Sequence, residues 1–221
     1  MATGRPREFD VGERLDRALE VFWRHGYEGA GLAELTEAMG ISRPSLYAAY
    51  GNKESLFRKA VDRYLDGPAR HIREAAEAPT ARAAAEGLLR GAASVTTTGP
   101  SRGCLVVQSA LVTGAQADAA RDELVSRRRA GELGLRARFA QAKADGELGD
   151  DVDAADLARY IAMISYGISV QAADGAEREE LDRAVDLALR AWPAASTPAE
   201  PAPAEPAPVE PSPAAPTPAE G

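Results

Sequence analysis

The stretch between residues 32 and 54 constrains the fold more than any other part of the chain. Its apolar residues, such as Leu35 and Met39, recur at helical spacing, and Gly40 supplies the positive φ that ends such a helix. Ser42 is a good N-cap for a second short helix that starts directly after the glycine. Two short helices joined by a tight glycine turn form a helix-turn-helix, a motif that places its second helix in the major groove of DNA.

The remainder of the chain is also predicted to be helical. Alanine, leucine, arginine and glutamate dominate its composition, and β-branched residues seldom occur in runs. Apolar residues recur at helical spacing in most segments between turn signals, and Gly67-Pro68 is expected to kink or break the helix that begins at Lys53. We therefore expect an all-α protein of about nine helices, in which an N-terminal helix-turn-helix DNA-binding domain precedes a C-terminal helical regulatory and dimerisation domain.

Changes in composition along the chain predict four segments. Residues 1–8 form a basic flexible arm, 9–52 the DNA-binding domain, 53–192 the ligand-binding and dimerisation domain, and 193–221 a tail, with the helix from residue 53 linking the two domains. Ten of the 15 prolines lie between Pro193 and Pro218, among alanine and glutamate. Such a segment cannot bury a core, so we expect a disordered tail that acts as a solubilising spacer or as a weak interaction arm.

The charge distribution is compatible with DNA binding although the formal net charge is −8. Residues 1–65 hold ten basic and ten acidic residues, so the acidic excess lies after them. Residues 41–60 hold four basic residues against Glu54 alone. Neutralising phosphates needs only a local positive surface, because the interaction is short-ranged in salt.

Several other classes of protein are not expected. The N-terminus has no apolar core for a secretory signal, and no apolar run approaches the ~20 residues of a membrane span, so we expect a cytoplasmic protein without membrane contact. The sequence offers no nucleophile elbow, phosphate loop or metal motif, and we expect neither an enzyme, nor a metal site, nor a cofactor. The single cysteine, Cys104, is interpreted as a small buried hydrophobe, with a redox sensor as the alternative. The run Arg127-Arg128-Arg129 is interpreted as a solvated helix face.

Residues 9–60 resemble the DNA-binding domain of the tetracycline-repressor (TetR) family of bacterial regulators. The resemblance is carried by Phe22-Trp23-Arg24-His25-Gly26-Tyr27, by Leu35-Thr36-Glu37-Ala38-Met39-Gly40-Ile41-Ser42, and above all by Leu46-Tyr47-x-x-Tyr50-x-x-Lys53-Glu54-x-Leu56. Tyr50 stands where the family usually has phenylalanine, which keeps an aromatic plug. Ala30-Gly31 stand where the family commonly has threonine followed by threonine or serine, which removes one phosphate contact.

This resemblance implies roles for individual residues. Tyr47 and Lys53 would contact phosphates, with Thr36 and Ser42 at the flanks, while Arg43, Pro44 and Ser45 would face base edges or thymine methyl groups. A helix N-terminus favours phosphate independently of the resemblance, and Lys53 opposes the dipole of its own helix unless an external anion meets it. The expected DNA-binding set is Thr36, Ser42, Arg43, Pro44, Ser45, Tyr47, Tyr50 and Lys53.

The C-terminal helices carry weaker signals. Polar or aromatic groups among aliphatic ones are candidates for a ligand cavity, although each fits a core or dimer-interface position equally well: Gln108, Tyr160, Met163, Tyr166 and Gln171. Two wide apolar stripes are expected to form a four-helix bundle across a two-fold axis: Leu157, Ile161, Ile164, Ile168, Leu181, Val185, Leu189 and Trp192.

Together these features predict a homodimeric transcriptional regulator that binds a pseudo-palindromic, double-stranded DNA operator. The expected mechanism is repression relieved by a small-molecule effector that favours a dimer with its recognition helices wrongly spaced. An effector-independent regulator, or one controlled by a protein partner, is the alternative.

Overall fold

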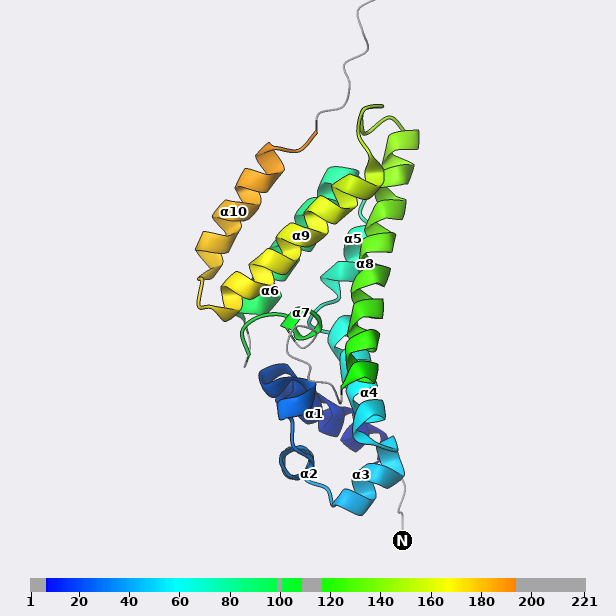
Figure 1. Ribbon diagram of the computed structural model, residues 1–221, viewed down its shortest axis with the longest axis vertical. Coiled ribbons are helices and arrows are strands. Elements are labelled where there is room, and N and C mark those ends of the chain that lie inside the picture. Colours follow the sequence, from blue (N-terminus) through cyan, green and yellow to red (C-terminus); the bar gives the residue numbers. More distant parts are fainter. Residues whose placement is uncertain (1–6, 99–100, 109–116, 194–221) are drawn as a thin grey trace, which may run out of the picture.

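The computed structural model describes residues 7–98, 101–108 and 117–193, and all regular structure in these ranges is helical (Figure 1). The ten helices are α1 (Arg7–Gly29), α2 (Leu32–Met39), α3 (Arg43–Tyr50), α4 (Lys53–Asp66), α5 (His71–Ala76), α6 (Ala81–Thr97), α7 (Leu105–Gln108), α8 (Asp118–Ala144), α9 (Ala154–Ala173) and α10 (Arg178–Arg190). Ten helices are found in place of about nine because the Gly67-Pro68 break divides the fourth from the fifth.

The helix-turn-helix consists of α2 and α3, and its turn has the expected local chemistry. Gly40 ends α2 in the left-handed conformation at φ 63° and donates its N–H to the Glu37 carbonyl. The Ser42 hydroxyl accepts the Ser45 backbone N–H at 3.2 Å, which caps α3. Asn52 caps α4 in the same way, accepting the Ser55 N–H at 2.7 Å. These caps begin and end three consecutive helices within a few residues of one another.

Aromatic packing between α1 and α4 holds the helix-turn-helix. The Phe22 and Phe57 side chains are completely buried, and their ring centroids lie 5.0 Å apart in an edge-to-face arrangement. Gly26, at φ 69°, kinks α1 in its last turn, and Tyr27 beyond the kink packs its ring 5.1 Å from that of Phe57. The core of this unit continues into α2 and α3 through Leu35, Met39, Leu46 and Tyr50.

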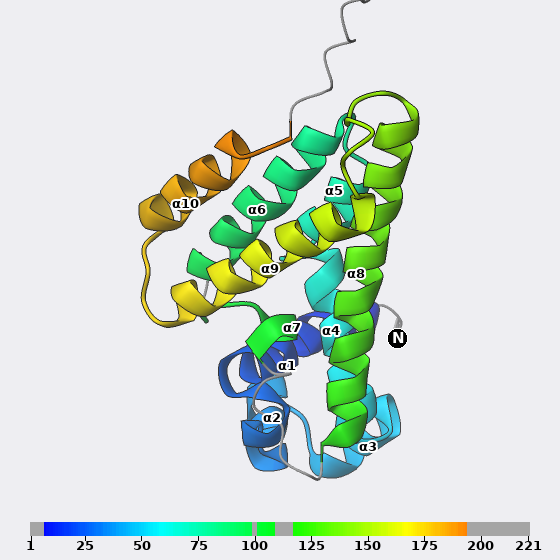
Figure 2. The same cartoon turned by 45° about the horizontal axis from the view of Figure 1, so that its top comes forward.

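The C-terminal domain is built around α6. Both α9 and α10 pack on this helix, and α8 packs against α9 and α5 (Figures 1 and 2). Gly131 and Gly134 of α8 face α5, and an added Cβ at these positions would lie in ordinary contact distance, 3.4 Å and 3.7 Å, of side chains of α5. A second core cluster, which includes Leu89 and Phe139, fills this domain.

The structure places the predicted dimer stripes inside the protomer. Five of the eight side chains are buried, and the other three are half-buried against the same core: Leu157, Ile161, Ile164, Ile168, Leu181, Val185, Leu189 and Trp192. The physical reason is that α9 and α10 turn these stripes toward α6 and its neighbours, which burial of apolar surface favours. A different set remains outside, with Tyr160, Met163 and Val170 of α9 exposed at 45, 64 and 38% and Leu187 of α10 at 63%.

The segment around α7 joins the two domains. The Trp23 indole N–H donates to the Gly103 carbonyl at 2.8 Å, and the Trp23 ring meets that of Tyr64 edge-on at 4.8 Å. Cys104, at 7% exposure, lies in the same core, as expected for a small buried hydrophobe. These buried side chains form part of the contact of α1 and α4 with the regulatory half.

The ends of the chain are described only in part. The helix α1 begins at Arg7, within the stretch expected to be a flexible arm, and residues 1–6 lie outside the described residues. The Pro-rich tail lies outside them from residue 194 onward. Over the part of the chain that the structure describes, no helix combines the length and the apolar character needed to cross a bilayer.

Candidate DNA-binding surface and ligand cavity

The outer face of α3 carries four of the eight predicted DNA-binding residues. Its exposed side chains are Arg43, Pro44, Ser45, Tyr47, Ala48 and Ala49, with Tyr47 45% exposed. Leu46 and Tyr50 face inward and fix the helix to the core. Figure 1 shows α2 and α3 at one end of the molecule, far from α10. The face of α3 is therefore a protruding surface of small, planar and cationic groups, which suits a DNA groove.

Lys53 is held beside this face by α1. Its ammonium lies 4.7 Å from the centroid of the Tyr27 ring and 3.5 Å from the Glu28 carbonyl oxygen. Partial burial lowers the pKa of Lys53, and nearby Glu28 acts in the opposite direction. The Tyr27 face stabilises the cation without neutralising it, since the contact is with a ring quadrupole. Lys53 thus keeps a charge available for a phosphate at the N-terminus of α4.

The other predicted residues have differing positions. Ser42 is exposed at the N-terminus of α3, and its hydroxyl lies 2.8 Å from that of Ser45. Thr36 is half-buried and donates its hydroxyl to carbonyls of its own helix at 2.9 Å. Tyr50, at 6% exposure, is part of the core. The buried ring is the aromatic plug of the recognition helix, and it lies away from the exposed DNA-binding face.

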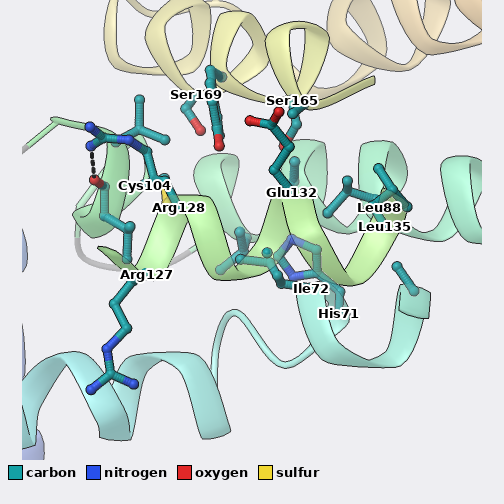
Figure 3. A pocket seen from close by; sticks show the side chains of 18 of the residues that line it. His71, Ile72, Leu88, Cys104, Arg127, Arg128, Glu132, Leu135, Ser165 and Ser169 are labelled. Carbon is teal, nitrogen blue, oxygen red and sulfur yellow. Dashed lines mark hydrogen bonds between the residues drawn. The ribbon is translucent and has the colours of Figure 1, made fainter. Parts of the chain in front are cut away.

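A cavity of about 70 Å³ is lined by residues of α4, α5, α6, α7, α8 and α9. Apolar side chains from α5 and α6 form one wall, among them Ile72, Leu88, Ala92 and Val95. The other wall carries polar groups of α8 and α9, and Figure 3 shows Glu132, Ser165 and Ser169 on the side opposite His71. An apolar wall facing a few convergent polar groups is typical of small-molecule sites.

Of the five predicted cavity residues, Tyr166 lines the cavity. Tyr160, Met163 and Gln171 are exposed on the outer side of α9, and Gln108, half-buried at the end of α7, lies outside the lining. Sequence reasoning missed His71, Arg127 and Arg128, which also line the cavity, while Arg129 is exposed as expected. The arginine run was interpreted as one solvated face, although neighbouring helical positions point in different directions.

His71 sits in the cavity wall as a neutral imidazole. Its ring packs directly on α6 at Gly91, where an added Cβ would come within 2.4 Å of the imidazole. Burial lowers the pKa of His71 from 6.5 to about 4, against smaller opposing effects of the Pro68 carbonyl and Glu74. A protonated ring would therefore be disfavoured in this position at neutral pH.

The His71 environment predicts a specific loss of stability in acid. Because the folded pKa of about 4 lies below the unfolded value of 6.5, the unfolded chain binds the extra proton, and stability falls as pH falls from 6.5 toward 4. We expect this residue to account for about 2 kcal/mol of that loss. Urea unfolding of the wild type and His71→Gln at pH 7 and pH 4.5 measures it as the difference between the two losses. Equal losses in both proteins would contradict the prediction.

Two consecutive arginines connect the cavity wall to neighbouring helices. The Arg127 guanidinium bonds to Asp62 of α4 and to Glu123 of its own helix, each at 2.7 Å. Arg128 donates to the Val106 carbonyl of α7 at 2.9 Å, a bond drawn in Figure 3. A change in the cavity can thus reach α4, whose first residue is Lys53, through side chains that touch both. Within the described ranges no three His, Cys, Asp or Glu side chains gather as a metal site would require.

Comparison with known proteins identifies the family. A sequence model of bacterial regulatory proteins of the tetR family matches residues 15–60. The transcriptional repressor ComR of Escherichia coli is 35% identical over 193 residues, which cover 86% of this chain and 92% of that protein. The uncharacterized regulator YezE of Bacillus subtilis is 32% identical over an alignment that covers 84% of this chain and 97% of that protein.

A solved structure agrees in both sequence and fold. It is the TetR family transcriptional regulator CifR, a cysteine mutant complexed with 26-bp double-strand operator DNA. That chain is 46% identical and aligns with a TM-score of 0.79. The alignment covers 86% of this chain and 100% of the CifR chain. The helix-turn-helix, the helical regulatory half and these relatives agree, and the chain belongs to the TetR family of bacterial regulatory proteins as a DNA-binding transcriptional regulator.

Proposed function

We propose that this protein is a cytoplasmic repressor that binds a pseudo-palindromic operator as a homodimer and releases it when a small molecule enters the cavity. The observation that carries this proposal is the exposed face of α3, flanked by Lys53 held over Tyr27. Two such faces must lie about one helical turn of DNA, ~34–36 Å, apart to occupy successive major grooves. The cavity wall contacts α4 through Arg127, which supports control of that spacing by a ligand.

Roles on DNA follow from the positions of the side chains. Tyr47 and Lys53 would bind phosphates and position the protein, with Ser42 at the helix N-terminus and Thr36 at the flank. Arg43, Pro44 and Ser45 would read base edges. Ala48 and Ala49, exposed on the same face, allow close approach but offer no side-chain hydrogen bonds. Specificity would therefore depend on few side chains and in part on DNA shape.

Replacing Lys53 with glutamine tests this assignment. We expect Lys53→Gln to weaken binding to the operator and to unrelated DNA alike, and to reduce the slope of log K against log salt by about 0.9, because one phosphate contact is lost. Fluorescence anisotropy at several salt concentrations measures both effects. The matched control is Lys59→Gln, the same charge change at an exposed position further along α4. An unchanged slope in Lys53→Gln would remove this residue from the contact surface.

Chemical modification of the Cys104 thiol is a second candidate signal for release of the operator. Cys104 is the only cysteine in the chain and lines the cavity. The CifR structure is that of a cysteine mutant. With iodoacetamide, the Cys104 sulfur would form a C–S bond as iodide leaves and the thiol proton passes to solvent. We expect alkylation to abolish operator binding in the wild type and to have no effect on Cys104→Ser. Mass spectrometry verifies that alkylation is complete. If operator binding stays intact after complete alkylation, this signal is excluded.

A further inference from the structure

One charged side chain that lines the cavity makes no ion pair with a described residue. The guanidinium of Arg127 is paired with Asp62 and Glu123, and the Glu132 carboxylate is paired with Arg159 at 3.2 Å. His71 is neutral above a pH of about 4. Arg128 donates a hydrogen bond to the Val106 carbonyl. Among the charged side chains of the lining, its guanidinium is the one that is not in ion-pair contact with a described carboxylate.

No carboxylate of the described residues lies within ion-pair distance of Arg128. The two internal stretches outside the described ranges, 99–100 and 109–116, contain no acidic residue that could supply one. Arg128 is partly buried, and a partly buried guanidinium with unused N–H donors is stabilised by an anion. The surrounding chain thus leaves these donors to something that enters the cavity.

The groups around Arg128 fit one end of such a molecule. Tyr166, from α9, lies close enough to Arg128 and Glu132 for both charges to influence its hydroxyl, and burial raises the pKa of that hydroxyl, so it is a donor at neutral pH. The facing wall of α5 and α6 is mostly apolar, with Ile72 and Val95 among its members, and its polar residues are His71 and Thr96. The cavity accordingly combines a corner that holds the Arg128 guanidinium and the Tyr166 hydroxyl with a mostly apolar opposite side.

Resting on the proposed function of the cavity as the effector site, we propose that the effector is a small carboxylic acid. Its apolar part lies against α5 and α6, and its carboxylate accepts hydrogen bonds from the planar fork of Arg128 and from the Tyr166 hydroxyl. Binding would draw Arg128 away from the Val106 carbonyl and so loosen α7, which the Trp23–Gly103 bond ties to α1. A cavity of about 70 Å³ suits an acid with a short apolar chain.

Matched pairs of acid and amide test the inference on the full-length protein. The probes are butanoate and hexanoate against butanamide and hexanamide, which have nearly the same shape without the charge, and binding is measured by titration calorimetry at pH 7. We expect each acid to bind at least about tenfold more tightly than its amide. Arg128→Gln should reduce this preference to within about twofold and leave the amide affinity unchanged. Amide binding as tight as acid binding, or a preference that survives in Arg128→Gln, would overturn the proposal.

Two further variants keep the test decisive. Arg129→Gln removes the same charge from the next residue of α8, which is exposed and lies outside the lining, and it should behave as the wild type. Tyr166→Phe leaves the Arg128–Val106 bond in place and should lower the affinity for the acid about threefold to tenfold. If Arg128→Gln does not fold, the Tyr166→Phe variant decides the test. An unchanged acid affinity in that variant counts against the proposal. Operator binding without probes is measured separately, so a chain that binds operator but shows no preference for acids refutes the effector class and leaves the repressor function standing.

Discussion

Placing aspartate on the outer face of α9 and α10 is expected to separate the dimer and to abolish tight operator binding. Met163 and Leu187 are exposed at 64% and 63%, and their helices, α9 and α10, are in contact with each other in the regulatory domain. On α9, Tyr160, Met163, Gly167 and Val170 follow one another at helical spacing, and Gly167 has open space around it for a crossing helix. We propose this face, rather than the stripes buried on α6, as the dimer surface.

A two-fold interface contains each substituted residue twice, so the effect is doubled. Each buried Met or Leu contributes about 1.5–3 kcal/mol, and a buried aspartate without a partner adds a further cost. We therefore expect Met163→Asp combined with Leu187→Asp to raise the dimer dissociation constant at least about a hundredfold, measured by analytical ultracentrifugation. Operator affinity should fall with it, because a monomer engages a single half-site.

The matched control is Leu133→Asp. Leu133 is 60% exposed on α8, which is not part of the proposed surface of α9 and α10, and the same substitution there should leave the dimer intact. A double variant that remains dimeric at nanomolar concentration would show that the chains associate through another surface.

Truncating Phe57 is expected to destabilise the DNA-binding unit severely. The ring is completely buried and meets Phe22 and Tyr27 at centroid distances of 5.0 and 5.1 Å, so its removal leaves a cavity between α1 and α4. We expect Phe57→Ala to lower the free energy of unfolding by about 3–5 kcal/mol, a large part of the total for a typical domain. Chemical unfolding followed by circular dichroism measures it.

A second, smaller substitution distinguishes the effect of lost side-chain volume from the effect of losing an apolar group. Phe57→Leu retains most of the volume and should cost about 1 kcal/mol. Operator binding should follow the same order, because Tyr27 loses a neighbour and the Lys53 ammonium rests over its ring. If Phe57→Ala unfolds within about 1 kcal/mol of the wild type, the α1–α4 contact does not hold this unit together.

The helix-turn-helix was predictable because its determinants are local. Gly40, Ser42 and Asn52 begin or end helices through bonds to residues a few positions away, and the structure confirms each cap. The break at Gly67-Pro68 was predictable for the same reason, since proline lacks the N–H that a continuing helix needs.

The all-helical structure of the regulatory half was predictable from the sequence, but which of its side chains face the core or the cavity was less so. Helix α9 carries apolar residues on several sides, Ile161 and Ile168 inward but also Met163 and Val170 outward, and periodicity alone cannot choose which stripe meets α6. The cavity is lined by six helices, with residues that range from Leu65 to Ser169, so a polar residue on one helix carries little information about it. Arg127 and Arg128 acquire their roles only when α4 and α7 are placed beside α8.

The length of α8 turns small changes into larger ones. With 27 residues it extends about 40 Å, from the end of α4 past the cavity to the far end of the regulatory domain (Figure 1). A rotation of about 3° around one end of such a rigid rod displaces the other end by roughly 2 Å. Gly131 and Gly134 of α8 face α5, and Gly131 also lines the cavity. A small molecule that shifts the contact between α8 and α5 would therefore cause a larger displacement at the end of α8 that lies beside α4, the helix that carries Lys53.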